Sequence, residues 1–287
     1  MARDQVVWID ADGGELNLND WVNYICLRDK TGMASPNYTF SSTKLPLSEG
    51  AMLNGVTVQP TYVDLKQIVR SSSASGLRTL MRDLQYRLDP TRGIGQLKIV
   101  SDGDTRILNC YPEGIKKDVD KITFKEMNLG FSAIEDPYWY AATATSVTIE
   151  NTSVSVSFFS STFLPLKLVK STIYSVETIN NPGDVHCYPI WTITGPGEGI
   201  VLKNLTSNKS INFVDGFELE SGQELIVDCR NLAKTVKLDG EDTFEMVDKL
   251  SSFWPFLKGN NQIQVQITNA SLDTVVKLEF TPRYGSA

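Results

Sequence analysis

The second half of the chain alternates apolar and polar residues with a period of two. The alternation is cleanest in Gln262–Ile267 and again in Val276–Phe280. Successive side chains of a strand point to opposite faces, so this pattern predicts strands with one buried face and one wet face. Because a helical period is almost absent from this half, we expect it to be all β.

More short strands are expected in the same half at a regular spacing. They are Ile190–Ile193, Ile200–Leu202, Ile211–Phe213, Leu225–Val227 and Thr235–Leu238. The expected turns are the dipeptides Asp215-Gly216, Ser221-Gly222 and Asp239-Gly240. Short strands separated by such turns predict a β-sandwich.

The first half contains two expected hairpins. One pairs Val6–Ile9 with Glu15–Leu18 across a glycine-containing turn. The other pairs Gln96–Ile99 with Arg106–Leu108 across Asp102-Gly103, a dipeptide that tolerates the positive φ of tight turns.

Between the two hairpins lies the one segment with a helical period. Its apolar residues recur at spacings of three and four: Leu77, Leu80, Met81, Leu84 and Leu88. Asp89-Pro90 and Gly93 are expected to end the helix. The stripe is either a partner-binding face or the side that covers a sheet, and we favour the second interpretation.

The apolar phase changes towards the end of the first half. After Ile122 and Phe124 it moves to Met127, Leu129 and Phe131, which predicts a β-bulge near Glu126. A proline and three aromatic residues then interrupt the pattern. With 287 residues the chain is long enough for two domains, and we place the boundary at this interruption, giving domains 1–140 and 141–287.

The composition argues against several partners. A net charge of −7 and a pI near 4.9 would repel a phosphate backbone, so no nucleic acid is expected. No run of eighteen apolar residues and no signal-like start is present, so no membrane association is expected. Four widely spaced cysteines fit reduced, buried thiols and synthesis in a cytoplasm.

No catalytic constellation emerges from the sequence. His186 is the single histidine, so a multi-histidine metal site is excluded, and a histidine-based triad would need a serine and an aspartate gathered around this one residue. Cys187 follows it directly, but neighbours on a strand point to opposite faces.

Gly195–Gly199 lacks the Lys-Ser/Thr of a phosphate loop and is interpreted as a turn. Asp10–Gly13 resembles the start of a calcium loop, but the twelfth position is Trp21 instead of glutamate. We therefore predict no catalytic residue, no metal and no cofactor.

Several motifs resemble one family along nearly the whole chain. In the first domain they are Trp8-Ile9-Asp10, Gly13-Gly14, Leu16-Asn17, Leu88-Asp89-Pro90, Gly95-Gln96-Leu97 and Arg106–Cys110. Later they are Asp136–Trp139, Asn181–Asp184, Tyr188-Pro189-Ile190, Gly195-Pro196, Ser252–Pro255 and Gly259–Asn261. In this order they are similar to the Dit-like distal tail proteins of siphophages, in the phage tail component branch.

The resemblance implies a mainly β fold, all-β or α+β. Residues 1–140 would form a tail-tube-like, ring-forming domain with one helix, and residues 141–287 a galectin-like β-sandwich. It implies a non-enzymatic virion protein of the phage tail tip, made in the host cytoplasm, whose homo-hexameric ring joins the tail tube protein to tail-tip, baseplate or receptor-binding proteins.

Two alternatives remain open. The first is a phage adhesin whose second domain binds carbohydrate, with His186, Tyr188 and Trp191 as the candidate residues. The histidine, asparagine, arginine and tryptophan cluster of a typical galectin site cannot be traced here. The second is an ancillary module of a wall-degrading enzyme. The tube-like pattern of the first domain disfavours both.

Overall fold

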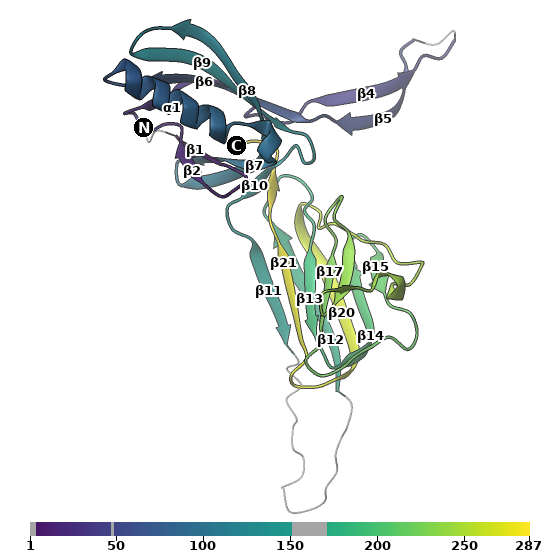
Figure 1. The fold of residues 1–287 in the computed structure, drawn as a ribbon. Helices are drawn as coiled ribbons and strands as arrows, with labels where there is room; N and C mark the ends of the chain where they lie inside the picture. The colour runs from purple at the N-terminus through teal and green to yellow at the C-terminus, as the bar shows by residue number, and fades with distance from the viewer. Residues whose placement is uncertain (1–3, 47–48, 151–170) are drawn as a thin grey trace, which may run out of the picture. The chain divides into compact units, whose positions relative to one another are not determined.

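The chain is mainly β, as predicted, and its strands form two separate units. The computed structural model describes residues 4–46, 49–150 and 171–287. The first unit contains residues 1–142 and 283–287, and the second contains residues 143–282 (Figure 1). The expected second domain ran from residue 141 to the end of the chain, whereas strand β22 (Arg283–Tyr284) pairs with β10 (Trp139–Ala141) in the first unit.

The first unit is an antiparallel sheet in the order β2-β1-β7-β8-β9-β6-β3, with β10 attached to β8. Its other strands are β1 (Gln5–Ile9), β2 (Glu15–Asn17), β3 (Tyr24–Thr31), β6 (Thr61–Arg70), β7 (Gly95–Ser101), β8 (Asp104–Asp120) and β9 (Phe124–Ala133). The long strand β8 pairs with β7 in its first part and with β9 in its second part. Trp8 of β1 contacts Phe131 of β9, with 5.0 Å between ring centroids, so the two parts of the sheet share one core.

Both expected hairpins of this unit are confirmed. β1 pairs with β2, and β7 pairs with β8. At the second turn Asp102 and Gly103 have φ values of 49° and 91°. Positive φ at both central residues is typical of the type I′ turn, whose twist matches that of the flanking strands.

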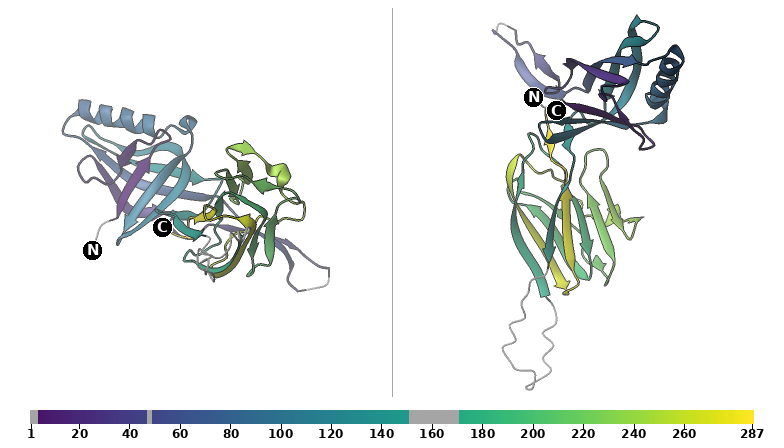
Figure 2. Two further views of the ribbon diagram at one scale, coloured as in Figure 1. Left: turned by 90° about the horizontal axis from the view of Figure 1, so that it is seen from below. Right: turned by 90° about the vertical axis from the view of Figure 1, so that its left-hand side faces the viewer.

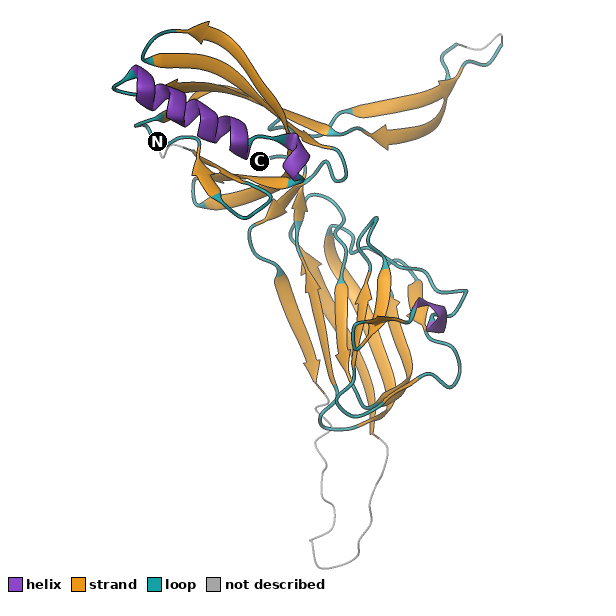
Figure 3. Ribbon diagram, in the orientation of Figure 1, coloured by secondary structure: helices purple, strands orange, loops and turns teal. Residues whose placement is uncertain are grey.

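The expected helix is also confirmed, as α1 (Ala74–Arg87), followed by the 3-10 turn η1 (Pro90–Arg92). Ser73 caps it, because the Gly76 amide donates to Ser73 Oγ at 3.1 Å. Leu77, Met81 and Leu84 are buried in the core of the first unit, which supports the interpretation of the stripe as the side that covers a sheet. Figure 3 shows the helix lying along the strands of this unit, and Figure 2 shows it at the periphery of the unit in both views.

The predicted bulge at Glu126 is wrong for the strand that contains this residue. Strand β9 pairs with β6 in continuous register from Phe124 to Ala133. The register shift lies opposite Glu126 on the partner strand β8, between Lys117 and Val119. The apolar phase changes because Ile122 is exposed, whereas Met127 and the residues that alternate with it point into the core.

The second unit consists of two antiparallel sheets, in the orders β11-β21-β13-β17-β18-β19 and β12-β20-β14-β15, with β16 attached to β14. The first sheet comprises β11 (Thr145–Glu150), β13 (Ile190–Thr194), β17 (Glu224–Asp228), β18 (Thr235–Leu238), β19 (Glu241–Asp242) and β21 (Val275–Phe280). The second comprises β12 (Ser171–Asn181), β14 (Gly197–Asn204), β15 (Lys209–Asn212), β16 (Glu218–Leu219) and β20 (Gly259–Ala270). A 3-10 turn, η2 (Phe244–Met246), follows β19.

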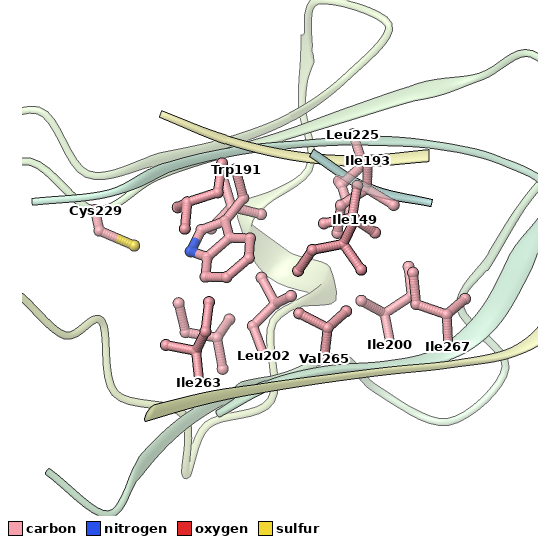
Figure 4. Close-up of a cluster of buried hydrophobic side chains, with 14 of the residues drawn as sticks. Ile149, Trp191, Ile193, Ile200, Leu202, Leu225, Cys229, Ile263, Val265 and Ile267 are labelled. Carbon is pink, nitrogen blue, oxygen red and sulfur yellow. The ribbon is translucent and has the colours of Figure 1, made fainter. Parts of the chain in front are cut away.

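The two sheets face each other across one hydrophobic core, as the sandwich prediction requires (Figure 4). Ile263, Val265 and Ile267 of β20 are fully buried, so the alternation seen in the sequence is the core face of this strand. Trp191 and Ile193 of β13 meet them from the opposite sheet.

The glycine-rich segment at Gly195 is only partly a turn. Strand β14 begins at Gly197, which pairs with Leu219 of β16. A Cβ on Gly197 would lie 2.5 Å from Cγ2 of Ile267, so a side chain at this position would displace the core. The glycine therefore serves close packing of the strand, and the segment offers no phosphate loop.

Candidate interaction surfaces

His186 and Cys187 do not form a catalytic pair. His186 Nε2 lies 3.0 Å from the Tyr188 hydroxyl, whereas Cys187 is fully buried and exchanges backbone hydrogen bonds with Phe256. Burial also raises the pKa of the Cys110 and Cys229 thiols to about 12, so neither is a ready nucleophile. Among the described residues no three His, Cys, Asp or Glu side chains gather in a way that would hold a metal ion.

The three residues considered for carbohydrate binding are not presented together. His186 and Tyr188 contact each other and are half-buried. Trp191 is 0% exposed and packs edge-on against Trp254 in the sandwich core, with ring centroids 5.8 Å apart. A ring must be exposed to stack on a sugar, so Trp191 is a core residue, and the expected aromatic platform is reduced to Tyr188.

The aspartates of the turn at Asp10 have a structural role. Asp10 Oδ1 accepts hydrogen bonds from the amides of Asp12 and Gly14, and Asp10 Oδ2 pairs with Arg87 at 3.2 Å. Asp12 forms an ion pair with Arg92. These contacts join the β1–β2 turn to the end of α1, which explains the aspartates without calcium.

A second cluster joins the end of the chain to the first unit. Arg283 is buried, and its Nη2 donates to Asp136 Oδ1 at 2.6 Å. The Tyr140 hydroxyl donates to Asp136 Oδ2, also at 2.6 Å, and the Arg283 guanidinium lies 4.6 Å from the centroid of the Tyr138 ring. The sequence marked Asp136–Trp139 as a motif, but its partner lies 147 residues away.

The first unit contains a hairpin with exposed apolar side chains that the sequence interpretation did not identify. Strands β4 (Tyr38–Thr43) and β5 (Met52–Val58) pair only with each other, and we call them the β4–β5 arm. Figure 1 shows the arm extending beyond the other strands of the unit.

One face of the arm is apolar. Phe40 pairs with Val56 and Tyr38 with Val58, and Leu53 follows opposite Ser42 after a bulge. Phe40 is 65% exposed, Leu53 56% and Val56 49%. The alternation of Tyr38 with Phe40 and of Val56 with Val58 was the available signal, but each run is very short.

The base of the arm is built to fix it in place. The arm is inserted between β3 and β6, which pair with each other. Gly32 adopts a φ of +77°, and a Cβ there would lie 1.8 Å from the Tyr62 carbonyl oxygen. The Gln59 amide donates to the Asn37 carbonyl at 2.8 Å and closes the base. Only glycine fits this close approach, so the chain leaves the sheet at a defined point.

Comparison with known proteins finds a family match in the second unit and a structural likeness along the whole chain. Residues 182–284 match the family described as siphovirus-type tail component, C-terminal domain. The Dit protein (gp 19.1) of phage SPP1, described as a paradigm of the hub adsorption apparatus in phages that infect Gram-positive bacteria, has a similar structure. Its TM-score is 0.68 at 13% identity, over 98% of this chain and 99% of that chain. The chain resembles the siphophage distal tail proteins.

Two structures of the phage p2 baseplate in its activated conformation also resemble the chain. The one with Ca gives a TM-score of 0.56 at 11% identity over 100% of both chains. The one with Sr gives 0.55 at 11% identity over 98% of both chains. No curated protein sequence matches the chain. The family match lies mostly in the second unit and extends into β22, so for the first unit the likeness rests on fold alone.

The described residues contain no helix with the length and hydropathy that a membrane crossing requires.

Proposed function

We propose that this chain is a structural protein of the distal end of a siphophage tail. In this proposal six copies close into a ring that joins the tail tube to the tail-tip or baseplate proteins and to receptor-binding proteins. The full-length likeness to a phage hub protein and to phage baseplate chains supports the proposal. The tail-component family match of residues 182–284 supports a virion location.

The exposed apolar face of the β4–β5 arm is the observation that supports the proposed ring. An isolated two-stranded hairpin is marginally stable in water, and contiguous exposed apolar surface marks interaction sites. Phe40, Leu53 and Val56 are exposed on the arm, and no other described part of the chain buries them. A ring subunit needs one surface that reaches its neighbour and a different surface that receives it, and an arm of this kind supplies the first.

The remaining chemistry fits a protein that acts by shape. The buried charged side chains described above form ion pairs within the chain, such as Arg283 with Asp136. All four cysteine side chains are buried, which supports synthesis in a reducing cytoplasm. A ring built from preformed β units requires no cofactor.

Native mass measurement of the purified full-length chain over a range of concentrations tests the proposal. A six-subunit species that forms as concentration rises is the expected result. A chain that stays monomeric at every concentration and is retained on host wall polysaccharide would instead favour the adhesin. Because Trp191 is buried, that alternative now depends on His186 and Tyr188, and loss of polysaccharide retention in His186→Ala would support it.

A further inference from the structure

The second unit carries a pocket with an apolar lining. It has a volume of about 320 Å³. Val214, Phe217, Leu238 and Met246 supply its apolar lining, and Asp215 and Glu218 also border it. Leu238 ends β18, which lies next to the edge strand β19 of one sheet, whereas the loop at Val214 follows β15 of the other sheet.

The walls of this pocket are fixed by hydrogen bonds and ring stacking. The Val214 amide donates to the Met246 carbonyl at 2.9 Å, and Phe213 forms a β-bridge with Val247. Phe217 stacks on Phe213 with 4.9 Å between centroids and 17° between ring planes. The pocket is therefore preformed, and a ligand would not have to order its walls.

Large apolar side chains are also exposed next to the lining residues in the sequence. Phe244, which follows the lining residue Thr243, is 45% exposed and stacks on Phe253 at 5.6 Å. Leu250, in the segment that follows η2, is 90% exposed. Contiguous exposed apolar surface marks interaction sites in soluble proteins.

The segment that contains all the lining residues of the pocket, residues 214–250, is strongly acidic. Residues 214–250 contain ten acidic and four basic side chains, a net charge of −6, compared with −7 for the whole chain. Asp215, Glu218, Asp242 and Glu245 are exposed, and none of them forms an ion pair with a described residue. Asp215 and Glu218 border the apolar lining, and Asp242 and Glu245 precede the lining residues Thr243 and Met246 in the sequence. We call these four acidic residues the rim of the pocket.

We infer that this acidic-rimmed pocket binds a segment of a partner protein in which one large apolar side chain lies between lysine or arginine residues. The volume is at the low end for small-molecule sites and fits one or two side chains. The rim attracts positive flanks and repels anionic saccharides or nucleic acid. The inference concerns the second unit alone and does not depend on the ring.

A random peptide library selected against the full-length chain tests this inference. The enriched peptides are expected to place Leu, Met or Phe between basic residues. Their affinity, measured by fluorescence anisotropy, should fall about tenfold when Asp215→Lys, Glu218→Lys and Glu245→Lys are combined, because three favourable charges become unfavourable. It should fall again when the central apolar residue of the peptide is replaced by serine.

The control combines Glu177→Lys with Asp273→Lys, and its affinity is compared with that of the double variant Asp215→Lys with Glu218→Lys, so that both reverse two exposed charges; neither Glu177 nor Asp273 lines the pocket. This control should keep the affinity of the wild-type chain, and both variants should keep its unfolding midpoint. Enrichment of neutral or acidic peptides, no enrichment, or equal losses in the rim variant and the control would overturn the inference. Loss of peptide binding with intact six-subunit assembly would leave the proposed ring untouched, so the two failures are distinguishable.

Discussion

The substitution Phe40→Ser is expected to weaken subunit association without weakening the fold. Phe40 is 65% exposed on the apolar face of the β4–β5 arm. A fully buried phenylalanine covers about 200 Å², so docking of the arm would remove about 130 Å² from water. At about 25 cal/mol per Å² this burial stabilises each interface by about 3 kcal/mol. Since about 1.4 kcal/mol is a factor of ten, the serine variant should associate about 100-fold more weakly.

Sedimentation velocity over a concentration series measures this effect. The matched control is Leu272→Ser, which removes a leucine that is 78% exposed on the second unit. Both variants should unfold within about 0.5 kcal/mol of the wild-type chain, because neither side chain is part of a core. Only Phe40→Ser should shift the curve from assembled to single chains.

Two results would refute the reasoning about the arm. If Phe40→Ser and the wild-type chain dissociate over the same concentration range, the apolar face of the arm does not lie in an interface. If Phe40→Ser lowers the unfolding midpoint as much as a core substitution does, the arm packs within its own subunit and its exposure has another origin.

Three further predictions concern stability and reactivity. Arg283→Ala should destabilise the first unit by about 3 kcal/mol, because it leaves a partly buried carboxylate without its guanidinium; calorimetry should show the transition of the second unit unchanged, and an unchanged first transition would contradict a stabilising pair of Arg283 with Asp136. Asp4→Asn should cost about 0.5 kcal/mol at neutral pH, because the hydrogen bond from Lys30 lowers the pKa of the Asp4 carboxyl. A lowered pKa gives stability that is present above the ordinary aspartate pKa and is lost as pH falls through the folded value, so urea midpoints of variant and wild type should converge in acid, and parallel curves would argue against the pair. Because the pKa values of Cys110 and Cys229 are raised, a thiol-specific disulfide reagent should label these two thiols only after denaturation. Rapid labelling of both thiols in the folded chain would contradict their burial.

The parts of the fold that the sequence predicted are those in which burial is one-sided. In β20 every second residue faces the sandwich core, so Ile263, Val265 and Ile267 produce a period of two. In α1 the residues that face the sheet produce a period near 3.6. Each pattern is set by the contact of one element with one core, so it is visible in a single local segment.

The arm left no comparable pattern because neither of its faces is buried in the chain. All six residues of β4 are exposed, and so are most residues of β5. Periodicity arises from burial, so a hairpin that is exposed on both faces need not show it. The closing of the first unit by β22 was also beyond reach, since Arg283 and Asp136 meet across 147 residues.

The carbohydrate residues show a different limit. An aromatic residue on a strand points either into the core or outward, and the identity of the residue does not say which. The register decides: Trp191 lies between Val227 and Leu278, which are both fully buried, so its ring points inward with them. His186 and Tyr188 lie outside any named strand, where no such register applies.

The two proposed surfaces differ in charge, and salt therefore separates them. Strands β4 and β5 contain no charged residue, whereas residues 214–250 carry a net charge of −6. Added salt screens exposed charges beyond about 8 Å at physiological strength, and sulfate also strengthens the burial of apolar surface. Assembly through the arm should therefore persist or strengthen in sulfate, while peptide binding at the acidic-rimmed pocket should weaken. If both weakened in parallel, charge would govern the arm as well, and a mechanism based on its apolar face would fail.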